Sequence, residues 1–127
     1  YDADGRKNEG RLPILLALTC LNGDIANPTL QTQSERLVLW PTGGVAAALA
    51  ASGSGVNRGH EQFADVFIPK LTAPTGDRSL GAAHMAAIAA LPVTHRDLAY
   101  SFAVLGDPLL TLPFVPTSAL YLPVIKR

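Results

Sequence analysis

The sequence lacks the features of several large classes of protein. It has one cysteine in 127 residues, so no disulfide can form within the chain and a zinc site built on cysteines is excluded. Ten basic and ten acidic residues cancel, which leaves no positive field to attract nucleic acid. No apolar run reaches the roughly 20 residues that a membrane-spanning helix requires. We therefore expect no metal site, no cofactor, no nucleic-acid partner and no membrane span.

What the chain does have is apolar surface to bury. Hydrophobic residues make up 48% of it and charged residues 16%, which suits one domain or a large part of one. Residues 1–11 are polar and predict a surface loop, and residues 115–127 predict an extended tail or linker. The chain begins with Tyr1 and has no signal-peptide pattern, so we expect an internal piece of a longer protein.

Residues 12–114 predict one α/β domain. Residues 12–19 are apolar on both faces, as in a central strand of a parallel sheet. Residues 45–51 predict a second buried strand between glycines, and residues 109–114 predict a last strand or an extended segment after the Gly106-Asp-Pro108 turn. The order of elements implies parallel crossovers, and hence a mostly parallel central sheet flanked by helices.

The remaining patterns predict helices over residues 32–39, 59–71, 79–91 and 95–104. Thr32 followed by Glu35 three residues later matches a capping box at the start of the first helix. Phe63, Phe67 and Leu71 recur on one face of the second. The third is rich in alanine and is expected to pack closely against the sheet.

The end of the first strand is the candidate reactive site. Cys20 follows the apolar run and is itself followed by Asn22-Gly23, a turn dipeptide. This arrangement places the thiol at the carboxyl-end edge of the sheet, where ligands of open α/β sheets bind. A thiol there is a candidate nucleophile. The alternative is that Cys20 is a small buried hydrophobic residue, as most lone cysteines are.

The loop after the second strand is expected beside Cys20. Parallel strands end at the same edge of a sheet, so the Ser52-Gly-Ser-Gly55 loop should lie next to the thiol.

The three histidines are expected elsewhere in the fold. We expect His60 to be a surface residue at the start of a helix. We expect His84 to be packed or half exposed in the alanine-rich helix, and His95 to be a solvated residue at a helix start. No two of them have metal-ligand spacing.

Four segments, in this order, resemble the gingipain-type cysteine peptidases of the caspase-like clan. They are LTCLNGD at 18–24, SERLVL at 34–39, TGGVAAALAAS at 42–52 and FAVLGDPLL at 102–110. Each is weak alone, but their order and spacing make the match specific. The resemblance covers residues 12 to about 114.

The resemblance implies a caspase-like α/β sandwich and endopeptidase activity, with Cys20 as the nucleophile. It implies that Ser52, Gly53 and Ser54 line the substrate site and pair with the substrate backbone; the alternative is that they form an ordinary strand-to-helix turn. The histidine of the family's Cys/His dyad lies upstream of the cysteine strand, and residues 1–19 contain no histidine. The base is therefore expected from a segment upstream of this chain.

The implied partners are a peptide or protein substrate and the upstream half of the same domain, or another chain. The implied location is outside the cell or at its surface. Two alternatives stay open at this point. One is a catalytically inactive caspase-like structural or binding module. The other is an unrelated small α/β domain with a buried cysteine.

Overall fold

The computed structural model describes residue 8 and residues 10–113. The predicted tail over 115–127, Phe114 of the predicted last strand, and most of the predicted loop over 1–11 lie outside the described residues. The described part is an α/β structure, as the sequence predicts.

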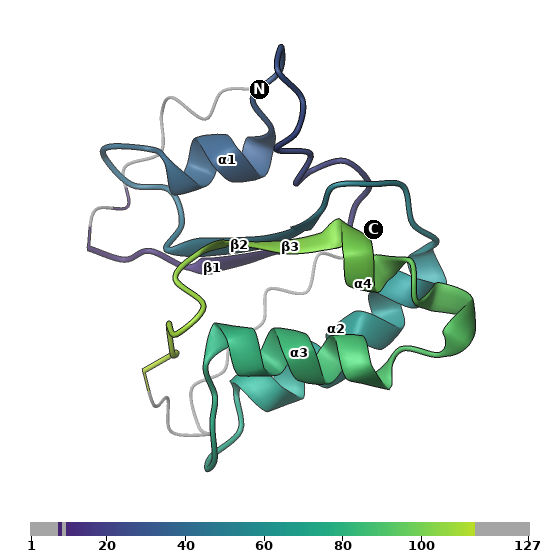
Figure 1. Ribbon diagram of the computed structural model, residues 1–127. Helices are drawn as coiled ribbons and strands as arrows, with labels where there is room; N and C mark the ends of the chain where they lie inside the picture. Colours follow the sequence, from purple (N-terminus) through teal and green to yellow (C-terminus); the bar gives the residue numbers. More distant parts are fainter. Residues whose placement is uncertain (1–7, 9, 114–127) are drawn as a thin grey trace, which may run out of the picture.

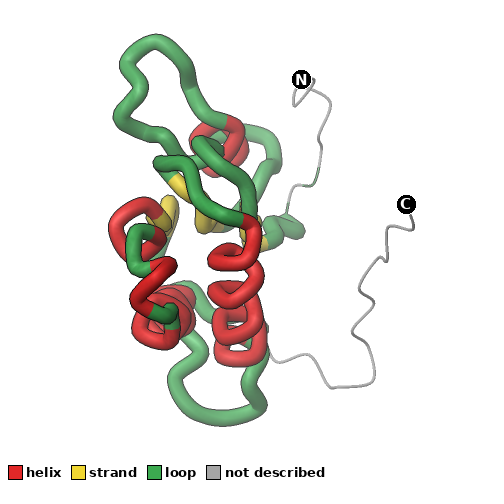
Figure 2. The backbone as a smooth tube through the Cα atoms, turned by 90° about the vertical axis from the view of Figure 1, so that its right-hand side faces the viewer, coloured by secondary structure: helices red, strands yellow, loops and turns green. Residues whose placement is uncertain are grey.

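The described elements are stacked in three layers. A three-stranded sheet lies in the middle, with α1 on one face and α2 and α3 on the other (Figure 1). A view turned by 90° shows the strands between these helices (Figure 2). The helices of the two outer layers are α1 (Gln33–Val38), α2 (Asn57–Leu71) and α3 (Leu80–Ala90).

The sheet is mixed, although the sequence predicts a mostly parallel one. Its strands, in spatial order, are β1 (Ile14–Ala17), β2 (Ala47–Ala51) and β3 (Phe102–Gly106). β2 pairs in parallel with β1 and antiparallel with β3, so that Leu49 lies between Leu16 and Val104. The crossover from β1 to β2 is thus parallel, as expected. The sheet differs from the prediction at β3, which runs antiparallel to β2.

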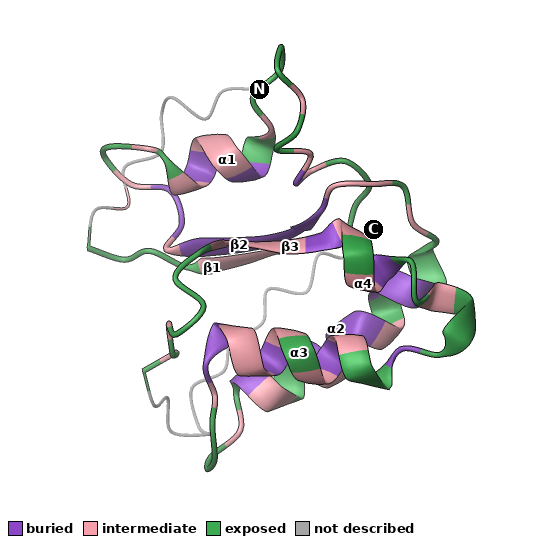
Figure 3. Cartoon of the chain, in the orientation of Figure 1, coloured by how far each residue is buried: buried purple, intermediate pink, exposed green. Residues whose placement is uncertain are grey.

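β2 is the buried centre of the molecule (Figure 3). Its side chains alternate between the two faces, as the strand period requires. Ala47, Leu49 and Ala51 belong to the core against α2 and α3, whereas Ala48 packs with Leu37 of α1 on the other face. The small alanines leave room for helices on both faces.

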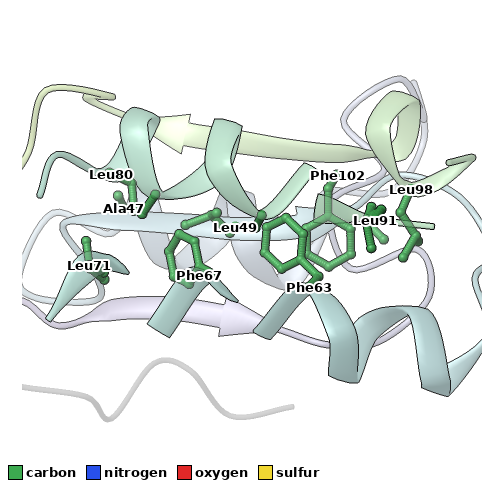
Figure 4. Close-up of a cluster of buried hydrophobic side chains, with 12 residues drawn as sticks. Ala47, Leu49, Phe63, Phe67, Leu71, Leu80, Leu91, Leu98 and Phe102 are labelled. Carbon is green, nitrogen blue, oxygen red and sulfur yellow. The ribbon is translucent and has the colours of Figure 1, made fainter. Parts of the chain in front are cut away.

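A set of stacked rings fills the core between the sheet and α2 (Figure 4). The ring of Phe63 lies 4.6 Å from that of Phe102 and 5.6 Å from that of Phe67, measured between centroids, and both pairs are stacked. All three side chains are buried. Phe63 and Phe67 come from α2 and Phe102 from β3, so this contact joins the helix layer to the sheet.

Two predicted helix starts are confirmed in detail. Thr32 caps α1, with its hydroxyl oxygen accepting from the Glu35 N–H, while the Glu35 carboxylate accepts from the Thr32 N–H at 2.7 Å. This is the predicted capping box. Ser79 caps α3, its hydroxyl oxygen accepting from the Ala82 N–H at 3.3 Å.

The predicted helix over 95–104 is wrong. The chain forms a 3₁₀ turn (η1, Val93–His95) and a single helical turn (α4, Leu98–Ser101), and then enters β3. The stretch from Leu98 to Leu105 is apolar throughout, apart from Ser101, so its periodicity cannot separate helix from strand. The free edge of β2 decides the outcome, because its buried backbone groups need hydrogen-bond partners.

Of the two alternatives predicted for residues 109–114, a last strand or an extended segment, the strand is not formed by the described residues 109–113. There, only Thr111 forms an isolated bridge, with Ser79. The turn before it is as expected: the Asp107 carboxylate accepts from the Leu109 N–H at 2.8 Å. The third strand of the sheet is β3, which precedes the Gly106-Asp-Pro108 turn and does not follow it.

Candidate active site

Cys20 lies in the turn that follows β1, with its thiol free and exposed. The next residue, Leu21, has a φ of 59°, the left-handed region that branched side chains rarely adopt. A leucine keeps such a backbone only where its surroundings hold it there. The contacts of the turn must therefore fix its shape.

Backbone hydrogen bonds continue the β1–β2 pairing into this turn. The Leu21 N–H donates to the carbonyl oxygen of Gly53 at 3.2 Å, and the Gly23 N–H donates to that of Ala51 at 2.9 Å. A Cβ at position 23 would lie 2.7 Å from the carbonyl oxygen of Ala50, so only glycine allows this close approach. The glycine of the predicted turn dipeptide is thus explained by backbone contact with β2.

The side chain of Asn22 fixes the other side of the turn. Its amide nitrogen donates to Oε1 of Gln33 at 3.2 Å, and its amide oxygen accepts from the hydroxyl of Ser34. Ser34 is fully buried in the first turn of α1. The turn that carries Cys20 is therefore tied both to β2 and to α1.

The sulfur of Cys20 contacts the loop that follows β2, as the sequence predicts. Sγ lies 3.5 Å from the backbone nitrogen of Gly55 and 3.6 Å from its carbonyl oxygen. The thiol can donate to the carbonyl oxygen, whereas a thiolate would accept from the N–H. Gly55 therefore offers a hydrogen-bond partner to either protonation state of the sulfur.

The three predicted substrate-binding residues differ in their surroundings. The backbone N–H and the hydroxyl of Ser52 both donate to the carbonyl oxygen of Ser101, at 2.8 and 3.0 Å. The carbonyl oxygen of Gly53 accepts from Leu21, and Ser54 is exposed. Ser52 and Gly53 thus hold the loop in place, and Ser54 is the one exposed to solvent.

The predicted surface position of His60 is wrong: the side chain is only 2% exposed. Helix α2 begins at Asn57, and position 60 lies on the buried face that also carries Phe63 and Phe67. The imidazole packs edge-on against Phe102, with 5.5 Å between ring centroids. The spacing of three and seven residues to the two phenylalanines is the sequence signal that identifies this inward position.

The other two histidines are half-buried. His84 lies on α3 with its ring 5.9 Å from that of Phe63. His95, expected as a solvated helix start, lies in η1 and approaches α2: a Cβ at Gly59 would be 3.2 Å from its ring. Within the described part of the chain, the hydrogen bonds of Cys20 Sγ go to Gly55 and to no histidine.

His84 predicts a pH dependence of stability. Burial lowers its pKa below the ordinary value of 6.5, while a hydrogen bond to the backbone of Phe102 acts in the opposite direction. As pH falls through 6.5, His84 binds a proton in the unfolded chain before it does so in the folded protein. The free energy of unfolding therefore decreases. We expect a His84→Gln variant to lose less stability than the wild type between about pH 7.5 and 5.5. Urea unfolding at both pH values measures this, and equal losses would contradict it.

Two negative findings concern the described residues alone. They contain no group of three or more histidine, cysteine, aspartate or glutamate side chains that could hold a metal ion. None of their helices is long and apolar enough to cross a membrane.

Comparison with known proteins gives one result. Residues 1–113 match the family model of peptidase family C25. No curated protein and no solved structure matches the chain significantly. The family match includes the Cys20 turn, the Ser52–Gly55 loop and the three strands described above.

Proposed function

Because the chain belongs to peptidase family C25, the gingipain family of cysteine peptidases, we propose that it acts in an endopeptidase with Cys20 as the nucleophile. The observation that carries this proposal is the position of the sulfur. It is exposed at the end of β1 and lies 3.5 Å from the Gly55 N–H. A thiolate at that point accepts a hydrogen bond from the loop and remains open to a peptide substrate.

The reaction follows from thiolate chemistry. The histidine base takes the proton of the Cys20 thiol. The thiolate attacks the carbonyl carbon of the scissile peptide bond, and the backbone N–H of Cys20 is one donor for the developing oxyanion. The C–N bond then breaks, the amine leaves with a proton from the histidine base, and a thioester remains on Cys20. Water attacks the thioester carbonyl and gives up a proton to the base. The C–S bond then breaks, the carboxylic acid is released, and the protonated base returns its proton to the sulfur, which restores the thiol.

The histidine base of this mechanism comes from a segment upstream of the chain. Three observations support this. Residues 1–19 contain no histidine. Among the described residues, His60 is buried with no hydrogen-bond partner for either ring nitrogen, and the hydrogen bonds of Cys20 Sγ go to Gly55 and not to His84 or His95.

The same upstream segment, or another chain, is the proposed partner at the outer edge of β1. Among the described strands β1 has one neighbour, β2, although its residues Ile14–Ala17 are entirely apolar. A further strand beside β1 would satisfy its outer backbone groups. It would also extend the sheet toward the caspase-like sandwich that we propose for the complete domain.

The loop Ser52-Gly53-Ser54 is the proposed substrate-binding segment. Its anchoring to Ser101 and Leu21 holds it beside the sulfur, and exposed Ser54 can meet a substrate backbone added along it. The substrate is a peptide or protein. We place the enzyme outside the cell or at its surface, on the family resemblance alone.

Labelling of the thiol tests the nucleophile. The full-length protein is treated with a peptidyl acyloxymethyl ketone, and the adduct is located by peptide mass spectrometry. We expect one adduct per molecule, on Cys20, formed in parallel with loss of activity, and none after unfolding in urea. Inactivation with the adduct on another residue would reject Cys20 as the nucleophile. Reaction of folded and unfolded protein at the same rate would support an inactive module.

A further inference from the structure

His60 is the most unusual buried group in the described structure. Its side chain is 2% exposed, and neither Nδ1 nor Nε2 has a hydrogen-bond partner among residue 8 and residues 10–113. Leaving both nitrogens unpaired in the interior costs free energy that an apolar side chain would avoid. Packing alone therefore does not account for a histidine at this place.

The ring lies directly against the loop that contacts Cys20. A Cβ built on Gly55 would lie 2.7 Å from Nε2 and 3.3 Å from Cε1 of His60. The same Gly55 carries the backbone nitrogen and carbonyl oxygen that lie 3.5 and 3.6 Å from the Cys20 sulfur. One residue thus contacts the buried imidazole on one side and the exposed thiol through its backbone.

We propose that His60 is a positioning residue for the Cys20 site: its imidazole fixes the place of Gly55, and Gly55 fixes the N–H that serves the thiolate. This inference rests on the proposed role of Cys20. Because neither ring nitrogen is hydrogen-bonded within the described residues, His60 acts on the sulfur through Gly55 and not as its base. The ring also packs edge-on against Phe102, which is itself stacked on Phe63.

The fit between ring and loop is tight, and this determines which substitution tests it. If a methyl group at position 55 already meets Nε2 at 2.7 Å, a wider six-membered ring at position 60 must push Gly55 away from its place. His60→Phe also replaces two unpaired nitrogens by apolar atoms in a buried site. The variant therefore separates stability, which should hold or rise, from the geometry of the thiol, which should change.

The experiment measures the rate at which iodoacetamide alkylates Cys20 in the full-length protein, with thermal unfolding of each variant as the check on folding. We expect His60→Phe to slow alkylation by about tenfold, the factor for losing one hydrogen bond to a charged group, with an unchanged or higher melting temperature. His84→Phe is the matched control, because it replaces a histidine of the same aromatic cluster, one that packs on Phe63 where His60 packs on Phe102. It should alkylate within about twofold of the wild type.

A second pair of variants keeps the test decisive if the wider ring is accommodated. Gly55→Ala should slow alkylation, because its methyl group collides with His60. Adding His60→Ala removes the collision and should restore part of the rate. If the factors by which the two single substitutions slow alkylation simply multiply in the double variant, the inference is overturned. An equal slowing in His84→Phe and His60→Phe would overturn it as well.

Failure of this inference is distinguishable from failure of the proposed function. Alkylation requires only the thiol and is measured without a substrate. If peptidase activity does not depend on Cys20, the proposed function fails while the alkylation rates still report on His60. If activity depends on Cys20 and the rates do not respond to His60, the positioning role alone is wrong.

Discussion

Replacing Cys20 by alanine in the full-length protein is expected to lower kcat/KM for peptide substrates by at least about 10³-fold. The thiol forms the covalent bond of the proposed mechanism, and what remains without it is binding and oxyanion stabilisation alone. Cys20→Ser should also be severely impaired, because a hydroxyl without its own activating geometry is a weak nucleophile. Steady-state kinetics on a mixture of peptides, followed by mass spectrometry of the products, measures the loss.

The fold itself should survive this substitution. Cys20 is exposed, so removing its sulfur takes nothing from the core, and the melting temperature should stay close to that of the wild type. Met85→Ala, an exposed substitution on α3, is the control for handling and concentration. Retention of more than about a tenth of the wild-type activity by Cys20→Ala would remove it from the chemistry.

The second large effect is on stability. Phe63→Ala should lower the free energy of unfolding by about 3–5 kcal/mol, because it leaves a cavity where three rings and a helix meet. Phe63 is completely buried and stacks on both Phe67 and Phe102. A loss of that size is a large share of the roughly 5–15 kcal/mol that holds a typical domain together. Urea unfolding followed by circular dichroism gives the value.

Two comparisons sharpen this prediction. Phe63→Leu keeps most of the volume and should cost clearly less than Phe63→Ala, while exposed Met85→Ala should stay within about 0.5 kcal/mol of the wild type. A loss below about 1 kcal/mol for Phe63→Ala would mean that the three rings do not carry the contact between α2 and the sheet.

The family and most of the local structure were readable from the sequence. The motifs around Cys20 and the Gly106-Asp-Pro108 turn pointed to the gingipain family, and the family match over residues 1–113 bears this out. Strands β1 and β2, the capping box of α1 and the start of α3 follow from short-range patterns. These features depend on neighbours within a few residues, so the sequence carries them directly.

The course of the chain after α3 was decided by the tertiary structure. The segment from Leu98 to Leu105 is apolar in nearly every position, and such a run suits a buried helix as well as a buried strand. What selects the strand is the open edge of β2, and this edge is brought close only when α2 and α3 fold back across the sheet. The antiparallel pairing of β3 is therefore a property of the assembled layers.

The features of the candidate site fall into the same two groups, those set by local sequence and those set by tertiary packing. The exposed thiol at a strand end and the loop beside it were predictable, because Asn22-Gly23 is a local turn signal and parallel strands end at one edge of a sheet. The burial of His60 under Gly55 was not predictable, because it depends on where α2 begins and on where β3 places Phe102. Local sequence determines which groups are available near Cys20, and only packing between distant segments decides which of them lie against its loop.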